Sequence, residues 1–202
     1  MSYAPEVFDC ESLEAAKAVI LTAGGGLSTD ERWDRETKWL MERISFDNTS
    51  DVIVDYGCGV GRLSKEIANP VLGVDISEPM RKFAVDYVGK ASFSTVSPEM
   101  FHVMVQDGFR AGGAVACWSL QHVQDLAVVV TALLGCLHPG GVLWTLDLGR
   151  RHVPGHGGEV PDDGVCLYDL LKAECALEST QPLDIWPEHP GDPGELRKWR
   201  KN

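Results

Sequence analysis

The chain has 202 residues, 44% hydrophobic and 24% charged, a length and composition that suit one globular domain and leave no room for two full-sized ones. Asp and Glu number 30 against 18 Lys and Arg, and the resulting net charge of -12 disfavours general binding to phosphate backbones. No apolar run approaches the length of a membrane span, no signal-peptide pattern begins the chain, and the six cysteines lack the spacing of a metal knuckle or a redox pair. We therefore expect a cytoplasmic protein with reduced thiols, no metal site and no membrane partner.

Two helices are predicted in the first 50 residues. Residues 11–22 are rich in Ala, Leu and Ile and are followed by three consecutive glycines. Ser28 and Glu31 have the spacing of a capping box, which predicts a second helix that extends to about Ile44. This second helix carries Trp33, for which a place in the core is favoured over a role as an aromatic lid.

Apolar runs alternate with helical segments through residues 51–148, and this alternation predicts an α/β fold with a mostly parallel sheet and helices on both faces. A further helix at 167–173 and two closing strands at 178–185 and 195–200 follow a loop rich in Gly and Pro. The five core strands are predicted at 51–55, 71–75, 91–96, 114–118 and 142–148, and the core helices at 62–68, between Ser77 and Gly89, and at 125–137.

A glycine-rich turn follows the first predicted strand, in the segment VDYGCGVG at residues 54–61. Glycine permits a tight strand-to-helix turn and lets a ligand approach the backbone closely. The free N–H groups of a following helix suit an anionic group. The dinucleotide fingerprint needs glycine or alanine one position later, where Arg62 stands, so a nicotinamide cofactor is disfavoured.

A carboxylate ends the second predicted strand at Asp75, 20 positions after Asp55. Adjacent parallel strands end at the same edge of a sheet, so we expect Asp75 to lie beside the glycine turn. A carboxylate in that place can accept protons from both hydroxyls of a ribose, and each such charge-assisted bond contributes about 1.5–3 kcal/mol.

Four segments resemble motifs of the class I S-adenosylmethionine-dependent methyltransferases. The resemblance implies a single Rossmann-like methyltransferase domain over residues 1–202, with N-terminal helices at 1–50 covering the cofactor site, a cofactor-binding core at 51–148, and an acceptor-side loop with closing strands at 149–202. The segments are VDYGCGVGR at 54–62, LGVDIS at 72–77, WSLQH at 118–122 and LHPGGVL at 137–143.

The resemblance also implies how S-adenosylmethionine would be held at the first strand. Asp55 would face the methionine amino group, directly or through water. The turn formed by Gly57, Cys58, Gly59 and Gly61 would let the backbone wrap the methionine portion.

The remaining implied contacts come from the ends of the next three strands. Asp75 would hold the ribose, and Ile76 would pack on the adenine. Ser97 would lie near the adenine amino group, at a position where the family usually has an acidic residue. Trp118 would line the pocket of the sulfonium group.

His122 is the candidate general base, because it follows the fourth predicted strand close to the expected methyl group and imidazole titrates in the useful range. A structural role for His122, as a hydrogen-bonding partner of a loop, stays open. Arg150, Arg151, His152 and His156 cluster after the fifth strand and could contact the acceptor.

The sequence thus predicts methyl transfer from S-adenosylmethionine by in-line displacement, with a small-molecule acceptor favoured because no inserted domain is long enough for a large docking surface. Nucleic acid is disfavoured as a partner. Two alternatives remain: a methyltransferase-like protein that binds the cofactor without catalysis of its own, as a partner or regulatory subunit, and a nicotinamide-dependent oxidoreductase. The oligomeric state is left open.

Overall fold

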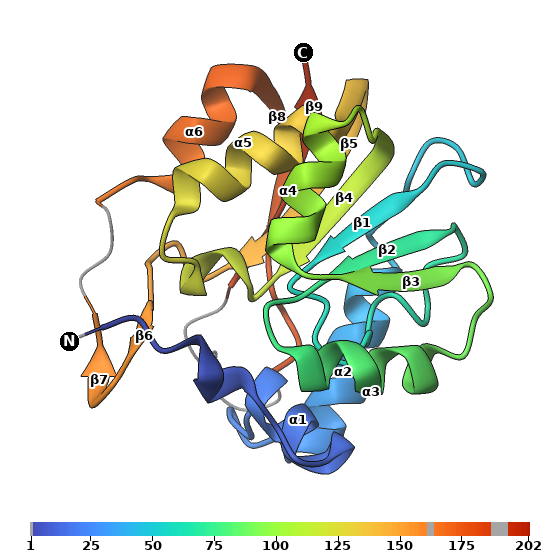
Figure 1. Ribbon diagram of the computed structural model, residues 1–202. Helices are drawn as coiled ribbons and strands as arrows, with labels where there is room; N and C mark the ends of the chain where they lie inside the picture. The colour runs from blue at the N-terminus through green and yellow to red at the C-terminus, as the bar shows by residue number, and fades with distance from the viewer. Residues whose placement is uncertain (1, 161–163, 187–193) are drawn as a thin grey trace.

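A computed structural model describes residues 2–160, 164–186 and 194–202 (Figure 1). Its strands are β1 (Ile53–Tyr56), β2 (Val71–Val74), β3 (Phe93–Val96), β4 (Ala111–Cys117), β5 (Leu137–Asp147), β6 (Pro154–Gly155), β7 (Gly158–Glu159), β8 (Cys175–Pro182) and β9 (Glu195–Lys201). Its helices are α1 (Leu13–Ile20), α2 (Thr29–Met41), α3 (Glu78–Val88), α4 (Pro98–Gln106), α5 (Leu126–Cys136) and α6 (Leu167–Glu174), with short 3-10 helices η1 (Pro5–Phe8) and η2 (Leu120–His122).

One seven-stranded sheet runs through the molecule in the order β3-β2-β1-β4-β5-β9-β8. The first five of these strands are parallel, whereas β9 is antiparallel to both of its neighbours. Helices cover both faces, with α4, α5 and α6 on one and α2 and α3 on the other (Figure 1). The expected α/β class, mostly parallel and with an antiparallel C-terminal strand, is confirmed.

Successive side chains along each strand point to opposite faces of the sheet, so each strand contributes to the hydrophobic core on both faces. Val54 and Tyr56 of β1 belong to the cluster under α4, α5 and α6. Ile53, one position earlier, belongs to the cluster that includes Leu40 of α2. Because both faces are covered, the central strands are apolar on both sides, which explains their continuous hydrophobic runs.

The order of strands reverses between β1 and β4, since β2 and β3 lie on one side of this pair and β5 on the other. Connections leave a crevice at the carboxyl ends of the strands where an open parallel sheet reverses in this way. The glycine turn after β1 and the segment after β4 both open onto this point.

The helix expected at 62–68 is wrong, because the structure has a series of hydrogen-bonded turns there. Lys65 N–H donates to the carbonyl of Gly61 at 2.9 Å, and Ile67 N–H donates to that of Leu63 at 3.0 Å. Pro70 disfavours helical backbone at Asn69, and the turns end before that residue.

A helix that the sequence analysis missed, α4, separates β3 from β4. Ser97 caps it by accepting a hydrogen bond from Met100 N–H, and Pro98 occupies its first turn. Ser77 caps α3 in the same way with Gly89 at the C-cap, as expected. The same serine-plus-proline signal was therefore present at residues 97–98. Strand bounds also differ: β4 begins three residues earlier than expected, β5 begins five residues earlier, and β8 spans 175–182.

Gly61 offers a test of the close approach between the glycine turn and α3. A Cβ at Gly61 would lie 2.4 Å from Val88 Cγ2, whereas a Cβ at Gly89 would meet nothing closer than Asp86 O at 3.8 Å. Both glycines have positive φ, so an alanine at either position strains the backbone. Only the alanine at Gly61 also clashes with a neighbouring side chain. We expect Gly61→Ala to lower the free energy of unfolding by about 1–3 kcal/mol more than Gly89→Ala in urea titrations.

The double variant Gly61→Ala/Val88→Ala should recover part of that loss, because it removes the methyl group that the new Cβ would meet. Equal losses for Gly61→Ala and Gly89→Ala would show that this packing contact is unimportant.

Candidate functional site

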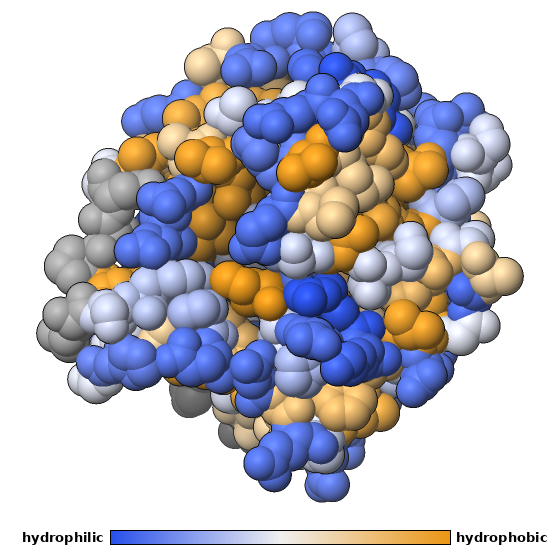
Figure 2. All heavy atoms as spheres, in the orientation of Figure 1, coloured by the Kyte–Doolittle hydropathy of each residue, from blue (hydrophilic) through white to orange (hydrophobic). Residues whose placement is uncertain are grey.

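A cavity of about 880 Å³ opens at the carboxyl ends of β1, β2 and β4, within the size range of small-molecule sites. Its wall is built from the N-terminal segment, the end of α1 and the loop after it, the glycine turn, the ends of β2 and β4, and parts of α4, η2 and α5. The apolar side chains that reach the surface over α4 and α5 are seen in Figure 2, and of these Val128 lies on the cavity wall.

The three glycines of the turn have positive φ values and different neighbours. A Cβ at Gly57 would lie 2.1 Å from Ser119 Cβ, so this glycine lets β1 and the segment after β4 come together. Gly59 faces Ile20 at the end of α1, where a Cβ would come within 2.6 Å of the Cδ1 atom. Gly57 and Gly59 line the cavity and Gly61, which packs on α3, does not.

The carboxylate of Asp75 joins the ends of two neighbouring strands. Its Oδ2 atom accepts a hydrogen bond from Gly59 N–H at 2.8 Å, and its Oδ1 atom accepts one from Ser77 N–H at 2.9 Å. Burial raises the pKa of Asp75, and the two N–H donors oppose that rise. Each oxygen retains a lone pair, and the side chain lines the cavity together with Ile76.

Four residues expected at the cofactor site do not line the cavity: Gly61, which packs on α3, and the three described next. Asp55 is buried behind the turn, where Ser64 Oγ donates to its Oδ2 atom at 2.6 Å, and burial raises its pKa to about 6. The thiol of Cys58 is buried against Gly73 of β2. The hydroxyl of Ser97 is used as the cap of α4. Their assignment to cofactor binding stays a prediction.

Glu36 of α2 is a site residue that the sequence analysis did not assign. Its carboxylate is fully buried and accepts from Arg62 Nη2 at 2.9 Å and from Trp118 Nε1 at 2.7 Å. Arg32, one helical turn earlier, donates to its other oxygen at 3.4 Å. The spacing of Arg32 and Glu36 is a recognisable i,i+4 pair, but Arg62 and Trp118 join it only through the fold.

Trp118 ends β4 in an unusual conformation, with φ of 58° in a residue other than glycine. Its backbone N–H donates to Leu146 O, and its indole lines the cavity. The bond to Glu36 fixes the ring, so the buried carboxylate of α2 sets the position of an aromatic wall at the reversal point of the sheet.

His122 also lines the cavity, and both of its ring nitrogens have partners. Because a carbonyl oxygen only accepts, Nδ1 donates to His152 O at 2.8 Å, and Nε2 is then free to accept from the amide of Gln121 at 3.1 Å. Burial lowers the pKa of His122, while the bond to His152 partly offsets this effect. The lowered pKa favours the neutral imidazole, which in this arrangement carries its lone pair on Nε2.

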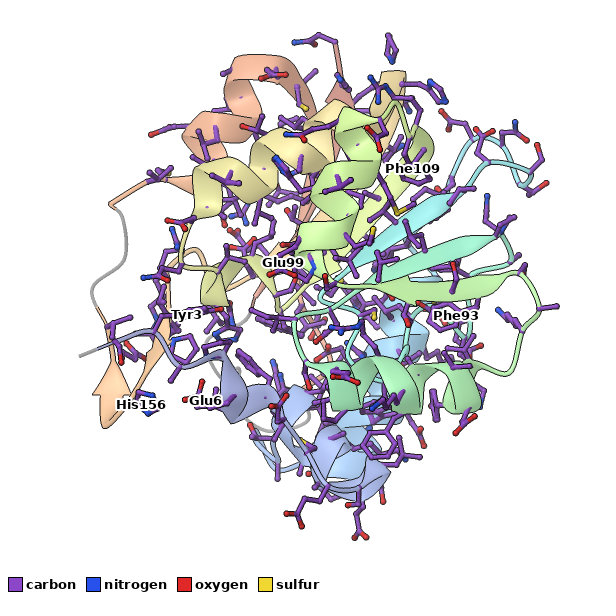
Figure 3. The ribbon with its side chains drawn as sticks, in the orientation of Figure 1. Tyr3, Glu6, Phe93, Glu99, Phe109 and His156 are labelled. Carbon is purple, nitrogen blue, oxygen red and sulfur yellow. The ribbon has the colours of Figure 1, made fainter. Side chains whose placement is uncertain are left out.

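The N-terminal segment adds aromatic side chains to the wall. Tyr3 and Phe8 line the cavity, and the ring of Phe8 lies 5.6 Å from that of His122. This segment is held by the β6–β7 hairpin, through Ala4 N–H donating to Pro154 O and a contact of 2.9 Å between His156 Nε2 and a carboxylate oxygen of Glu6 (Figure 3). Among the described residues, no group of three or more His, Cys, Asp or Glu side chains could hold a metal ion.

Residues 54–145 match a family model described as a methyltransferase domain. A demethylmenaquinone methyltransferase of Desulfitobacterium hafniense is 26% identical over 113 residues, covering 51% of this chain and 44% of the relative. A ribosomal RNA-processing protein of Arabidopsis thaliana is 28% identical over 145 residues, covering 72% of this chain and 42% of the relative. The chain therefore spans less than half the length of either curated relative.

Two solved structures share the fold over most of both chains. The N-methyltransferase NodS from Bradyrhizobium japonicum, in complex with S-adenosylhomocysteine, aligns with a TM-score of 0.66 at 11% identity and covers 95% of this chain and 93% of its own. The [4+2]-cyclase SpnF aligns with a TM-score of 0.65 at 16% identity and covers 90% of this chain and 85% of its own. In the described parts of the chain, no helix has the length and apolar character needed to cross a membrane.

The buried carboxylate of Glu36 makes a prediction about stability. Glu36→Gln keeps the shape of the side chain but leaves the buried guanidinium of Arg62 without its counter-charge. We expect the free energy of unfolding to fall by about 3–5 kcal/mol, the usual cost of breaking a buried ion pair on one side. The matched control is Glu42→Gln, which removes an exposed pair with Arg43 and should cost about 0–1 kcal/mol.

Chemical denaturation of both variants in the same buffer checks this expectation. Similar losses for Glu36→Gln and Glu42→Gln would mean that the buried network does not anchor α2.

Proposed function

We propose that the chain binds S-adenosylmethionine in this cavity and transfers the methyl group to a small-molecule acceptor, because residues 54–145 match a methyltransferase-domain model and the fold is shared with a methyltransferase that binds S-adenosylhomocysteine. One observation carries the proposal. The glycine turn and the carboxylate of Asp75 are joined by a hydrogen bond and line the same cavity at the reversal point of the sheet.

The wall fits the chemical parts of this cofactor. Asp75 has lone pairs for the two hydroxyls of a ribose, and Ile76, which is 38% exposed, offers an apolar face for the adenine. Gly57 and Gly59 leave room for the methionine portion at the turn, and Trp118 lines the space beside it. The cofactor supplies an activated methyl group, so the tasks left to the protein are to orient the acceptor and to exclude water.

A small acceptor is favoured by the composition of the wall near His122. Tyr3, Phe8 and Leu148 are aromatic or apolar, and the only Arg or Lys among the described lining residues is Arg32. A phosphate backbone would need several cations, and the chain carries a net charge of -12. Although one relative is a ribosomal RNA-processing protein, we propose a small apolar molecule with a hydroxyl or amine group as the acceptor.

A second candidate is cofactor binding without methyl transfer. The fold occurs both in a methyltransferase and in a [4+2]-cyclase, so the fold alone does not determine the chemistry. A further observation favours this candidate: the Nε2 lone pair of His122, the proposed base, already accepts from Gln121. A base at this position would have to give up that bond when the acceptor arrives.

The first functional prediction concerns Asp75. We expect calorimetry to show micromolar or tighter binding of S-adenosylhomocysteine to the wild type, and Asp75→Ala to weaken it by a factor of about 10 or more, the worth of a charge-assisted hydrogen bond. The control is Glu78→Gln, a nearby exposed carboxylate paired with Lys82, which should bind normally. Unchanged affinity in Asp75→Ala would remove the ribose assignment.

The second concerns His122. If it acts as the base, His122→Ala should lower the methyl-transfer rate by about 10²–10⁴-fold with little change in cofactor affinity. The base must be neutral, so the wild-type rate should fall as the pH drops through a pKa below the ordinary value of histidine, and the variant should lack this dependence.

A structural His122 makes a different prediction. The variant would melt at a lower temperature, because the bond to His152 is lost, and its activity would follow its folded fraction. A rate loss below about threefold would leave the base unassigned.

A further inference from the structure

The side chain of Gln121 is held in one orientation on the cavity wall. The residue is 7% exposed and lines the cavity, and its Oε1 atom accepts from Leu148 N–H at 3.2 Å. A backbone N–H can only donate, so this contact fixes which end of the amide is the oxygen. The amide nitrogen Nε2 therefore faces His122, and only one of its two hydrogens has a partner among the described residues.

The imidazole of His122 is fixed from its other side. Its Nδ1 atom donates to His152 O at 2.8 Å, which leaves the lone pair of the neutral ring on Nε2. The backbone N–H of His152 also donates to Gln121 O at 2.8 Å. The loop after β5 thus supplies the partners that orient both residues, and a fixed donor stands 3.1 Å from a fixed acceptor on the wall.

A group that enters between Gln121 and His122 replaces their mutual hydrogen bond, so it must accept from the first and donate to the second. A hydroxyl does both with a single atom. An ammonium group only donates, and an ether, carbonyl or carboxylate oxygen only accepts, so each of these leaves one of the two side chains unpaired. Alkylamines, with a pKa like that of lysine at about 10.4, are ammonium ions at pH 7.

The surroundings of the pair favour this discrimination. The ring of Phe8 packs on the imidazole of His122, with 5.6 Å between the ring centroids. Burial lowers the pKa of His122, and the carboxylate of Glu159, which acts against this effect, is paired with His152 Nδ1 at 2.5 Å. The neutral ring is therefore favoured, and an apolar neighbourhood makes an unpaired donor or acceptor more costly.

We propose that Gln121 and His122 together select a hydroxyl as the methyl acceptor, with Gln121 Nε2 donating to the hydroxyl oxygen and His122 Nε2 accepting its hydrogen. This inference rests on the proposed function and deepens it from a hydroxyl or amine to a hydroxyl. The transfer forms a carbon–oxygen bond and passes the hydroxyl proton to His122 Nε2, while the electron pair of the broken carbon–sulfur bond stays on sulfur.

Two probes of equal shape test the selection by calorimetry on protein saturated with S-adenosylhomocysteine at pH 7. They are 2-naphthalenemethanol and 2-naphthalenemethylamine, which is an ammonium ion at this pH. The carboxylates of Glu99 and Asp125, which line the cavity, would favour the cation, so the two features of the wall make opposite predictions. We expect the alcohol to bind about 10-fold more tightly than the amine, because the amine leaves the Gln121 donor unpaired.

Gln121→Glu should reverse this preference. The variant keeps the shape of the side chain and an oxygen for Leu148 N–H, but it replaces the donor that faces His122 with a second acceptor. The matched control is Gln106→Glu, which changes the charge by the same amount at an exposed glutamine whose Nε2 lies 2.8 Å from His102 Nε2. The control should keep the preference of the wild type.

Nitrogen NMR of the His122 ring gives a readout that needs neither activity nor a probe. We expect Nδ1 to carry the hydrogen and Nε2 to be unprotonated in the wild type at pH 8, and Gln121→Glu to raise the pKa of the ring, since a carboxylate beside Nε2 favours the imidazolium ion. A hydrogen on Nε2 in the neutral wild-type ring would overturn the arrangement without any variant.

The remaining outcomes separate this inference from the proposed function. If the wild type binds S-adenosylhomocysteine but then binds the amine as well as the alcohol, or binds neither probe, the selection of a hydroxyl is wrong while the function stands. An unchanged preference in Gln121→Glu would show that Gln121 does not make the selection. If the wild type does not bind S-adenosylhomocysteine, the proposed function itself fails.

Discussion

The carboxylate of Glu36 is fully buried, so its charge has to be met by donors inside the protein. Those donors come from three places: Arg32 on the same helix, Arg62 directly after the glycine turn, and Trp118 at the end of β4. The two strands that flank the reversal point of the sheet are thereby fixed to α2. The network therefore connects the glycine turn, the indole of Trp118 and the guanidinium of Arg32 to one carboxylate.

The same network shapes the electrostatics of the cavity. Arg62 is paired with Glu36 and does not line the cavity. Arg32 lines it and is the one Arg or Lys among the described lining residues. Asp75 also lines the cavity and accepts hydrogen bonds from two backbone N–H groups.

The fold of this chain occurs in proteins with different activities, so the side chains that line the cavity determine the chemistry more directly than the fold does. A methyltransferase and a cyclase align with this chain about equally well, at TM-scores of 0.66 and 0.65. What they share with this chain is the fold, and a fold hosts different reactions through the side chains of its site. In this chain many of those side chains come from outside the sheet: from the N-terminal segment, the end of α1 and the loop after it, α4, η2 and α5.

The sequence by itself determined the features that act over a few residues. The capping box at Ser28 and Glu31, the cap of α3 at Ser77, the tight turn at the glycines and the apolar strands all depend on neighbours in the chain, and the parallel sheet follows from their alternation. Asp75 was placed beside the turn because adjacent parallel strands end at the same edge. The missed cap at Ser97 belongs to this class too, since its signal was local.

Only the tertiary structure decided the pairings across long stretches of chain. Glu36 meets Arg62 across 26 positions and Trp118 across 82, and no periodicity encodes such partners. Whether His122 has free nitrogens depends on the backbone of His152, 30 positions away, and the contact between Trp186 and Arg32 depends on where the C-terminal strands dock. The physical reason is that hydrophobic burial fixes the register of whole elements, and the polar partners of a buried side chain are then whatever that register brings within reach.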